Sequence, residues 1–161
     1  MKYSQSLSVV VPIYNDEEVI NELLRRLTAV METIASDYEI ILVDDGSRDR
    51  SWTVMNESKQ HYSHLRIARL SRNFGQQNAI AAGLSLTTKD LIVLMDSDLQ
   101  DRPEDIPVLV DALLADKAAI TYAKCSLSLL RASSPFLCSL FGWLPISAPC
   151  YAREVWWRRW H

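Results

Sequence analysis

Two carboxylates, Asp96 and Asp98, follow directly on an apolar run at residues 91–95, and Gln100 lies two residues further on. The unbroken run predicts a strand buried on both faces of a parallel sheet. In open α/β sheets, ligands bind outside the carboxyl ends of the strands, where both carboxylates would lie. Carboxylate oxygens are hard donors that suit Mg²⁺ or Mn²⁺, and Mg²⁺ usually takes one or two carboxylates together with substrate phosphates. The spacing therefore predicts a metal–diphosphate site at a strand end.

A plainer interpretation is that Asp96 and Asp98 are loop carboxylates that cap a helix beginning at Pro103. Acidic residues commonly precede a helix that starts with proline. Two aspartates separated by one residue form a weak motif on their own. The rest of the chain has to decide between the two interpretations.

Apolar runs alternate with segments of helical periodicity along most of the chain. Helix starts are expected at Asn15–Glu18, as cap and acidic first turn, and at Ser47 or Asp49. Strands alternating with helices of this length predict an α/β fold with right-handed crossovers and a largely parallel sheet. The expected strands cover residues 7–12, 38–43, 65–70, 90–95 and 118–122, and the main expected helices cover 19–34, 76–86 and 103–114.

Each of the first four expected strands ends in a polar cluster, at Pro12–Asp16, Asp44–Ser47, Arg72–Gly75 and Asp96–Asp101. The carboxyl ends of parallel strands meet at one edge of the sheet. Four independent helix caps would be a poor explanation of clusters that converge in this way. The convergence favours a binding site.

The clusters, in this order, closely resemble the family 2 glycosyltransferases, and within them the polyprenyl-phosphate branch, which includes dolichyl-phosphate mannose synthase and bactoprenol glucosyltransferases. The resemblance covers roughly residues 6–124. Its motifs are Val11–Glu17, Val43–Ser47, Ser71–Gly75 with Ala82 and Gly83 downstream, and Asp96–Asp101 with Pro103 and Glu104.

The resemblance implies a GT-A (Rossmann-like) fold, incomplete at its C-terminus, that binds a UDP- or GDP-sugar. Carried over by position, the residues that would bind the nucleotide sugar are Pro12, Tyr14, Asp16, Asp44, Asp45 and Asp96. Those that would hold a Mg²⁺ or Mn²⁺ ion against the diphosphate are Asp96, Asp98 and Gln100. Gly46 would let the backbone turn tightly against the ligand.

The resemblance also implies inversion at the sugar carbon by direct displacement, with Asp98, Arg72 and Asp101 as catalytic candidates. Arg72 could contact the diphosphate or the acceptor phosphate, because guanidinium binds phosphate oxygens bidentately, or it could form a surface salt bridge. Lys124 is a weaker candidate of the same type. A polyprenyl-phosphate acceptor is already anionic, whereas a sugar hydroxyl usually needs a positioned carboxylate, for which Asp101 would be considered.

The composition changes near residue 124. Residues 1–124 carry 13 Lys and Arg against 19 Asp and Glu, whereas residues 125–161 carry four Arg and only Glu154, together with all three cysteines. The odd cysteine count, without a recognisable signal peptide, favours reduced thiols. We interpret residues 1–124 as the nucleotide-sugar-binding part. Residues 125–161 are then either a degenerate or frame-shifted end, which the abrupt shift favours, or an interfacial segment with Arg158 and Arg159 beside tryptophans.

Three functions remain open. The first is an active transferase that makes a polyprenyl-phosphate sugar at the cytoplasmic face of the plasma membrane. We expect this protein to be attached peripherally, because no run of about 18 apolar residues predicts a transmembrane helix. The second is a weak or inactive remnant that only binds nucleotide sugar. The third is an unrelated α/β phosphate-binding domain, which the motif order disfavours. The mildly acidic charge gives no reason to expect a nucleic-acid partner.

Overall fold

The computed structural model describes residues 2–116 and 120–121 of the chain. The chain forms two compact units, Met1–Pro107 and Val108–His161. Every candidate site residue except Lys124 belongs to the first unit. The expected strand at residues 118–122 falls mostly outside the described residues, and Lys124 with the proposed boundary beside it falls wholly outside them.

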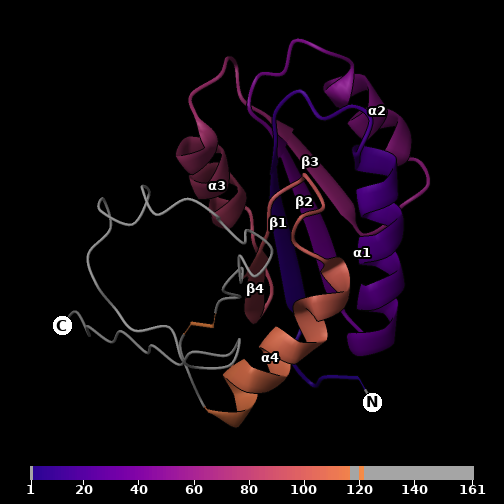
Figure 1. Ribbon diagram of the computed structural model, residues 1–161, viewed down its shortest axis with the longest axis vertical. Coiled ribbons are helices and arrows are strands. Elements are labelled where there is room, and N and C mark those ends of the chain that lie inside the picture. The colour runs from indigo at the N-terminus through magenta and orange to yellow at the C-terminus, as the bar shows by residue number, and fades with distance from the viewer. Residues whose placement is uncertain (1, 117–119, 122–161) are drawn as a thin grey trace, which may run out of the picture. The chain divides into compact units, whose positions relative to one another are not determined.

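The first unit is built on a four-stranded sheet with the order β3-β2-β1-β4, in which every neighbouring pair is parallel (Figure 1). All seven residues of β1 and all seven of β2 are buried, as expected for the two central strands. This confirms the predicted parallel sheet. The strands are β1 (Leu7–Ile13), β2 (Tyr38–Asp44), β3 (Leu65–Arg69) and β4 (Leu91–Leu94).

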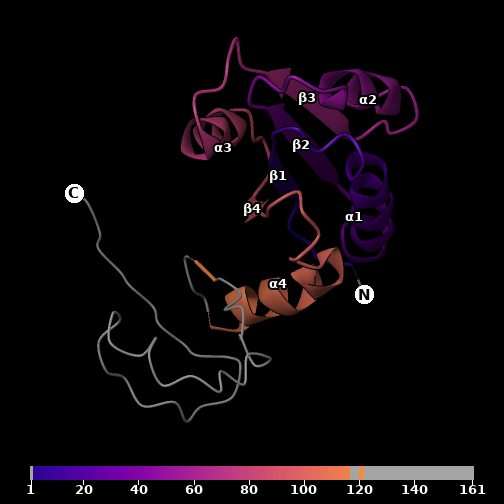
Figure 2. The ribbon, with the colours of Figure 1, turned by 45° about the horizontal axis from the view of Figure 1, so that its top comes forward.

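Helices cover both faces of this sheet, with α1 and α2 on one face and α3 on the other (Figures 1 and 2). On α1 the buried side chains recur every three or four residues, which is the pattern of a helix with one apolar face. In the part of the chain that the structure describes, no helix is long and apolar enough to cross a membrane. The helices are α1 (Ile20–Ile34), α2 (Ser51–Ser58), α3 (Gln76–Ser85) and α4 (Ile106–Ala115), the last preceded by a 3₁₀ turn at Pro103–Asp105.

A glycine allows α3 to approach the sheet closely. A Cβ atom on Gly83 would lie 2.4 Å from Cγ1 of Val10 and 3.1 Å from Cγ2 of Val43. Ala79, one turn earlier, is fully buried in the same cluster with Val10 and Ile41. Small residues on the inner side of α3 therefore fix the distance between this helix and strands β1 and β2.

The prediction that β4 is buried on both faces is wrong. Ile92 and Leu94 are 48% and 49% exposed, and their neighbours Leu91 and Val93 are only partly buried. Within the described residues, β4 pairs with β1 alone and forms the edge of the sheet. An apolar run shows that a strand suits a buried position, but it does not show how many elements cover that strand.

The predicted helix caps are also partly wrong. Residue Val19 precedes α1, and no side chain caps that helix. Asn15 instead uses its side chain on the following loop, where its Oδ1 accepts a hydrogen bond from the Arg48 N–H. At α2, Asp49 Oδ1 accepts a hydrogen bond from the N–H of Ser51, the first helical residue, at 3.0 Å. The polar residues after β1 therefore join two loops rather than starting a helix.

A buried carboxylate ties the strands together at the end of the sheet opposite to the polar clusters. Glu39 is 6% exposed and accepts hydrogen bonds from the Ser8 hydroxyl at 2.7 Å, from the Thr88 N–H at 2.8 Å and from Arg66 Nη1 at 2.7 Å. Burial raises the pKa of this carboxyl group, but these hydrogen bonds outweigh burial and bring the pKa down to about 2 from an ordinary 4.5. Glu39 therefore stabilises the fold in its ionised form.

We expect acid to remove this stabilisation. Because the folded chain binds the Glu39 proton more weakly than the unfolded chain, the contribution is complete above about pH 4.5 and falls as the pH approaches 2. A shift of this size corresponds to about 3 kcal/mol in the free energy of unfolding. Urea titrations between pH 7 and pH 3 should show a smaller loss of stability with acid for Glu39→Gln than for the wild type. Parallel curves for the two proteins would contradict this account.

Candidate functional site

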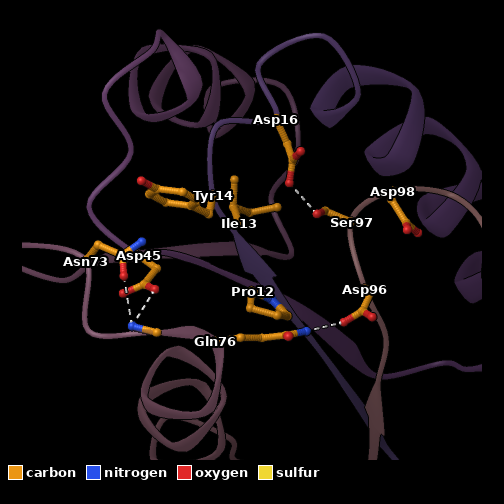
Figure 3. A pocket seen from close by; sticks show the side chains of 11 residues that line it. Pro12, Ile13, Tyr14, Asp16, Asp45, Asn73, Gln76, Asp96, Ser97 and Asp98 are labelled. Carbon is orange, nitrogen blue, oxygen red and sulfur yellow. Dashed lines mark hydrogen bonds between the residues drawn. The ribbon is translucent and has the colours of Figure 1, made fainter.

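A cavity of about 330 Å³ lies at the carboxyl ends of the strands, where the sequence predicted a binding site (Figure 3). Its volume is within the range of small-molecule sites in proteins. All four polar clusters contribute residues to its wall, the Asp44–Ser47 cluster through Asp45 alone. The cavity is lined by Pro12, Ile13, Tyr14, Asp16, Asp45, Asn73, Gly75, Gln76, Asp96, Ser97 and Asp98.

The acidic turn after β4 is held from two sides of the cavity. Gln76 Nε2, from the first residue of α3, donates a hydrogen bond to Asp96 Oδ1 at 2.7 Å. On the other side, the Ser97 hydroxyl donates a hydrogen bond to the carboxylate of Asp16, from the loop after β1 (Figure 3). Asp98 Oδ1 accepts the Gln100 N–H within the turn. These contacts join the turn to α3 and to the loop after β1.

Asp96 and Asp98 fit the donor set of a hard divalent cation. Both side chains line the cavity and are exposed to solvent. One oxygen of each carboxylate accepts a hydrogen bond, which leaves the Oδ2 atom of each for a cation. No group of three or more His, Cys, Asp or Glu side chains suited to a metal occurs among the described residues. Two carboxylates would therefore need further donors, such as the phosphates of a bound ligand.

The third predicted metal ligand, Gln100, is not brought to the cavity. Its side chain is exposed and does not line the cavity wall. Its backbone N–H instead supports Asp98. Leu99 between them has a φ of 61°, in the left-handed region.

Asp45 lines the cavity, and its carboxylate also accepts hydrogen bonds from a neighbouring loop. Asp45 is 2% exposed, and it accepts hydrogen bonds from the N–H groups of Phe74 at 2.8 Å and Gly75 at 2.9 Å. The loop at residues 71–75 contributes Asn73 and Gly75 to the cavity. Asp45 therefore positions part of the cavity wall as well as forming part of it.

Gly46 packs closely against another part of the protein. Its φ is +68°, which glycine adopts without strain, but its close neighbour is the protein backbone. A Cβ atom on Gly46 would lie 2.4 Å from the carbonyl carbon of Arg72 and 2.6 Å from the nitrogen of Asn73. The glycine lets the turn after β2 pack against the 71–75 loop, next to the hydrogen bonds of Asp45.

Asp44, predicted to bind the nucleotide, does not line the cavity. It is fully buried and forms an ion pair with Arg69, with 2.9 Å between Oδ2 and Nε. Its Oδ1 accepts a hydrogen bond from the Ser47 N–H at 2.9 Å. Because β2 ends at Asp44 and side chains alternate along a strand, Asp44 and Asp45 face different surroundings. Asp44 therefore stabilises the turn after β2 and is not one of the residues available to a ligand.

Pro12, Tyr14 and Asp16 all line the cavity, and Tyr14 is 42% exposed. Two hydrogen bonds hold the loop that carries them. The N–H of Asp16 donates to the Ser51 hydroxyl at 3.0 Å, and the N–H of Asn15 donates to the Ser47 hydroxyl. These three predicted residues therefore come together on one wall.

Arg72 and Asp101 lie outside the cavity wall. Arg72 is exposed, and its guanidinium carbon lies 4.8 Å from the centre of the Phe74 ring, in cation–π geometry. None of the ion pairs found among the described residues involves Arg72. The described residues therefore do not form the surface salt bridge that was the alternative for Arg72. Its side chain lies beside a half-exposed aromatic ring at the edge of the site.

Five residues that line the cavity were not predicted: Ile13, Asn73, Gly75, Gln76 and Ser97. Four of them lie within the recognised motifs. Gln76 lies one residue beyond its motif, and the only signal in the sequence is its place at the expected start of a helix after Gly75. Its pairing with Asp96 depends on the start of α3 meeting the turn after β4, which the sequence did not specify.

Comparison with known proteins identifies the family. Residues 8–128 match the family described as "Glycosyl transferase family 2". A curated relative, undecaprenyl-phosphate 4-deoxy-4-formamido-L-arabinose transferase of Enterobacter sp. (strain 638), is 51% identical over 105 residues. That alignment covers 65% of this chain and 32% of the relative. The chain therefore spans about a third of the length of this relative.

Solved glycosyltransferases share the fold. The mannosyltransferase PcManGT from Pyrobaculum calidifontis, in complex with GDP-Man and Mn²⁺, has a TM-score of 0.61 at 22% identity, with 69% of this chain and 33% of that chain covered. Glucosyl-3-phosphoglycerate synthase from Mycobacterium tuberculosis, in complex with Mn²⁺, UDP and glucosyl-3-phosphoglycerate, gives 0.56 at 25% identity, covering 69% and 40%. S. aureus TarS 1-349 in complex with UDP-GlcNAc gives 0.53 at 26% identity, covering 70% and 32%. These likenesses confirm the predicted GT-A fold.

Proposed function

Because this chain belongs to the family 2 glycosyltransferases, we propose that its cavity binds the nucleoside diphosphate of a nucleotide-sugar donor together with a divalent cation. The observation that carries this proposal is the placement of Asp96 and Asp98 on the wall of one cavity with Pro12, Tyr14 and Asp45. The carboxylates supply cation donors, and the other three line the space for a nucleoside. UDP and GDP both appear among the ligands of the solved neighbours, so both are candidates.

Asp96 and Asp98 are the residues that would hold the cation, Mg²⁺ or Mn²⁺. When bound, the cation would neutralise charge on the leaving nucleoside diphosphate and orient it. Asp98 has the most direct role in this proposal, because its one hydrogen bond among the described residues is within its own turn. Two of the solved neighbours contain Mn²⁺, which supports a divalent ion without choosing between the two metals.

We propose that the acceptor is undecaprenyl phosphate or a similar polyprenyl phosphate, and that the sugar is of the 4-deoxy-4-formamido-L-arabinose type. The support is the curated relative, whose name gives both. A lipid phosphate is already ionised near neutral pH and needs little help from a general base. Asp101, the candidate base for a hydroxyl acceptor, lies off the cavity wall, which fits a phosphate acceptor better.

We propose that Arg72 and Phe74 contact the acceptor. Both side chains are exposed on the loop that also supplies Asn73 and Gly75 to the cavity. A guanidinium group binds phosphate oxygens, and the neighbouring ring offers an apolar surface to the lipid chain. An acceptor of this kind would bring the protein to a membrane surface.

The transfer reaction tests this proposal. Vesicles containing undecaprenyl phosphate would be incubated with the 161-residue chain, Mn²⁺ and labelled UDP- or GDP-sugars, and the label in the extracted lipid would be counted. We expect lipid-linked sugar with one donor class, about tenfold less with Arg72→Ala because a charge-assisted phosphate contact is lost, and no change with Arg50→Ala, an exposed arginine away from the cavity. Nucleotide binding without any transfer would contradict the acceptor assignment and leave the donor site standing.

A further inference from the structure

Gln76 lies directly against one of the two carboxylates that we assign to the cation. Its Nε2 atom donates a hydrogen bond of 2.7 Å to Asp96 Oδ1, across the cavity from the loop after β1 (Figure 3). We infer that Gln76 is a positioning residue, which orients the Asp96 carboxylate so that its other oxygen faces the cation. This inference rests on the proposed function, because it concerns the metal site of the donor.

The chemistry of the contact defines what Gln76 does. An ionised carboxylate only accepts hydrogen bonds, so the glutamine must present its NH₂ group to Asp96. With Oδ1 engaged in this way, rotation of the carboxylate about its Cβ–Cγ bond is restricted, and Oδ2 is left as the available donor. Asp96 would then approach the cation through one oxygen.

The two partners are held at a fixed spacing by the same residue of β1. On one side, α3 packs on Val10 at Gly83. The packing is so close that a Cβ atom on Gly83 would clash with the Val10 side chain. On the other side, the N–H of Met95, next to Asp96, donates a hydrogen bond to the carbonyl oxygen of Val10 at 3.2 Å. Gln76 therefore acts from the first residue of α3 onto a carboxylate in the turn that follows β4. Sites built on regular elements in this way are positioned more accurately than sites built on loops.

Side chains that orient metal ligands from outside the coordination sphere typically change metal affinity 10- to 100-fold when they are removed. The contact between Gln76 and Asp96 is exposed to solvent, so we expect an effect at the lower end of this range, about tenfold. The affinity for the nucleotide itself should not change once the cation site is saturated, because Gln76 acts only through Asp96.

The test measures how much Mn²⁺ is needed for half-maximal binding of UDP or GDP, whichever the wild type binds. Gln76→Ala and Gln76→Met both remove the NH₂ group, and the second keeps the length of the side chain. Gln77→Ala is the matched control, since Gln77 is the next residue of α3, is exposed and does not line the cavity. Thermal unfolding without Mn²⁺ shows whether each variant is folded.

We expect both Gln76 variants to need about tenfold more Mn²⁺ than the wild type and Gln77→Ala, with equal nucleotide affinity at saturating Mn²⁺ and equal unfolding temperatures. An unchanged Mn²⁺ requirement would overturn the inference. Weaker nucleotide binding at every Mn²⁺ concentration, together with a lower unfolding temperature, would also overturn it and show a structural role. If the wild type binds neither nucleotide, the proposed function fails, and the inference fails with it.

Discussion

Replacing Asp98 with alanine is expected to abolish Mn²⁺-dependent nucleotide binding, with at least about a 100-fold loss of affinity. Removing a residue that only supports a metal ligand already costs up to about 100-fold, and Asp98 is one of the two carboxylates on this wall that we assign to the cation. The remaining carboxylate, Asp96, is already engaged by Gln76 through one oxygen. The measurement is calorimetric titration of the variant with UDP and GDP in the presence of Mn²⁺.

The same substitution should leave the fold intact. Asp98 is exposed, and its one hydrogen bond is to the Gln100 N–H two residues away, so the free energy of unfolding should change by less than about 0.5 kcal/mol. Asp101→Ala is the matched control, because Asp101 belongs to the same acidic segment but lies off the cavity wall. Equal binding by the Asp98 and Asp101 variants would show that the acidic turn does not hold the cation.

The Gly46→Ala substitution is expected to lower the free energy of unfolding by about 2–5 kcal/mol and to weaken nucleotide binding. A positive φ costs a residue with a Cβ atom about 1–2 kcal/mol, and forcing an atom into occupied space typically costs a further 1–3 kcal/mol. The new Cβ atom would meet the backbone of Arg72 and Asn73, which cannot rotate aside as a flexible side chain could. The loop at residues 71–75 would have to move, and the cavity wall would move with it.

A second glycine separates the two costs. Gly75 also has a positive φ, of 92°, but a Cβ atom there would meet nothing within 4 Å. Gly75→Ala should therefore carry only the cost of a positive φ, without a steric clash. Urea titrations should show a smaller loss in the free energy of unfolding for Gly75→Ala than for Gly46→Ala. If the two variants are equally stable, the turn after β2 does not pack against the 71–75 loop as the structure shows.

Much of the fold could be predicted because local pattern and tertiary environment agree. The branched apolar residues of β1 and β2 suit central strands, and the spacing of Leu23, Leu24 and Leu27 suits a helix packed on a sheet. The carboxyl ends of parallel strands meet at one edge whatever the details of packing. For that reason the cavity could be located, and Asp96, Asp98 and Asp45 are on its wall.

The remaining details depend on contacts between distant segments. Adjacent residues Asp44 and Asp45 look equivalent in the sequence, but one pairs with Arg69 inside the turn and the other faces the cavity. Gln76 has no partner until α3 and β4 are both packed on Val10. Ile92 and Leu94 are as apolar as the residues of β1, yet they are half exposed at the edge of the described sheet. Local sequence pattern carries no information on which surfaces meet.

Calorimetric titration of the wild-type chain with UDP and GDP, with and without Mn²⁺, tests most directly whether the cavity is a donor site. We predict that one of the two nucleotides binds, and that removing Mn²⁺ with a chelator weakens this binding strongly, because Asp96 and Asp98 on the cavity wall would hold the diphosphate through the cation. Binding of neither nucleotide by the folded chain, or equal binding with and without the metal, would contradict the account.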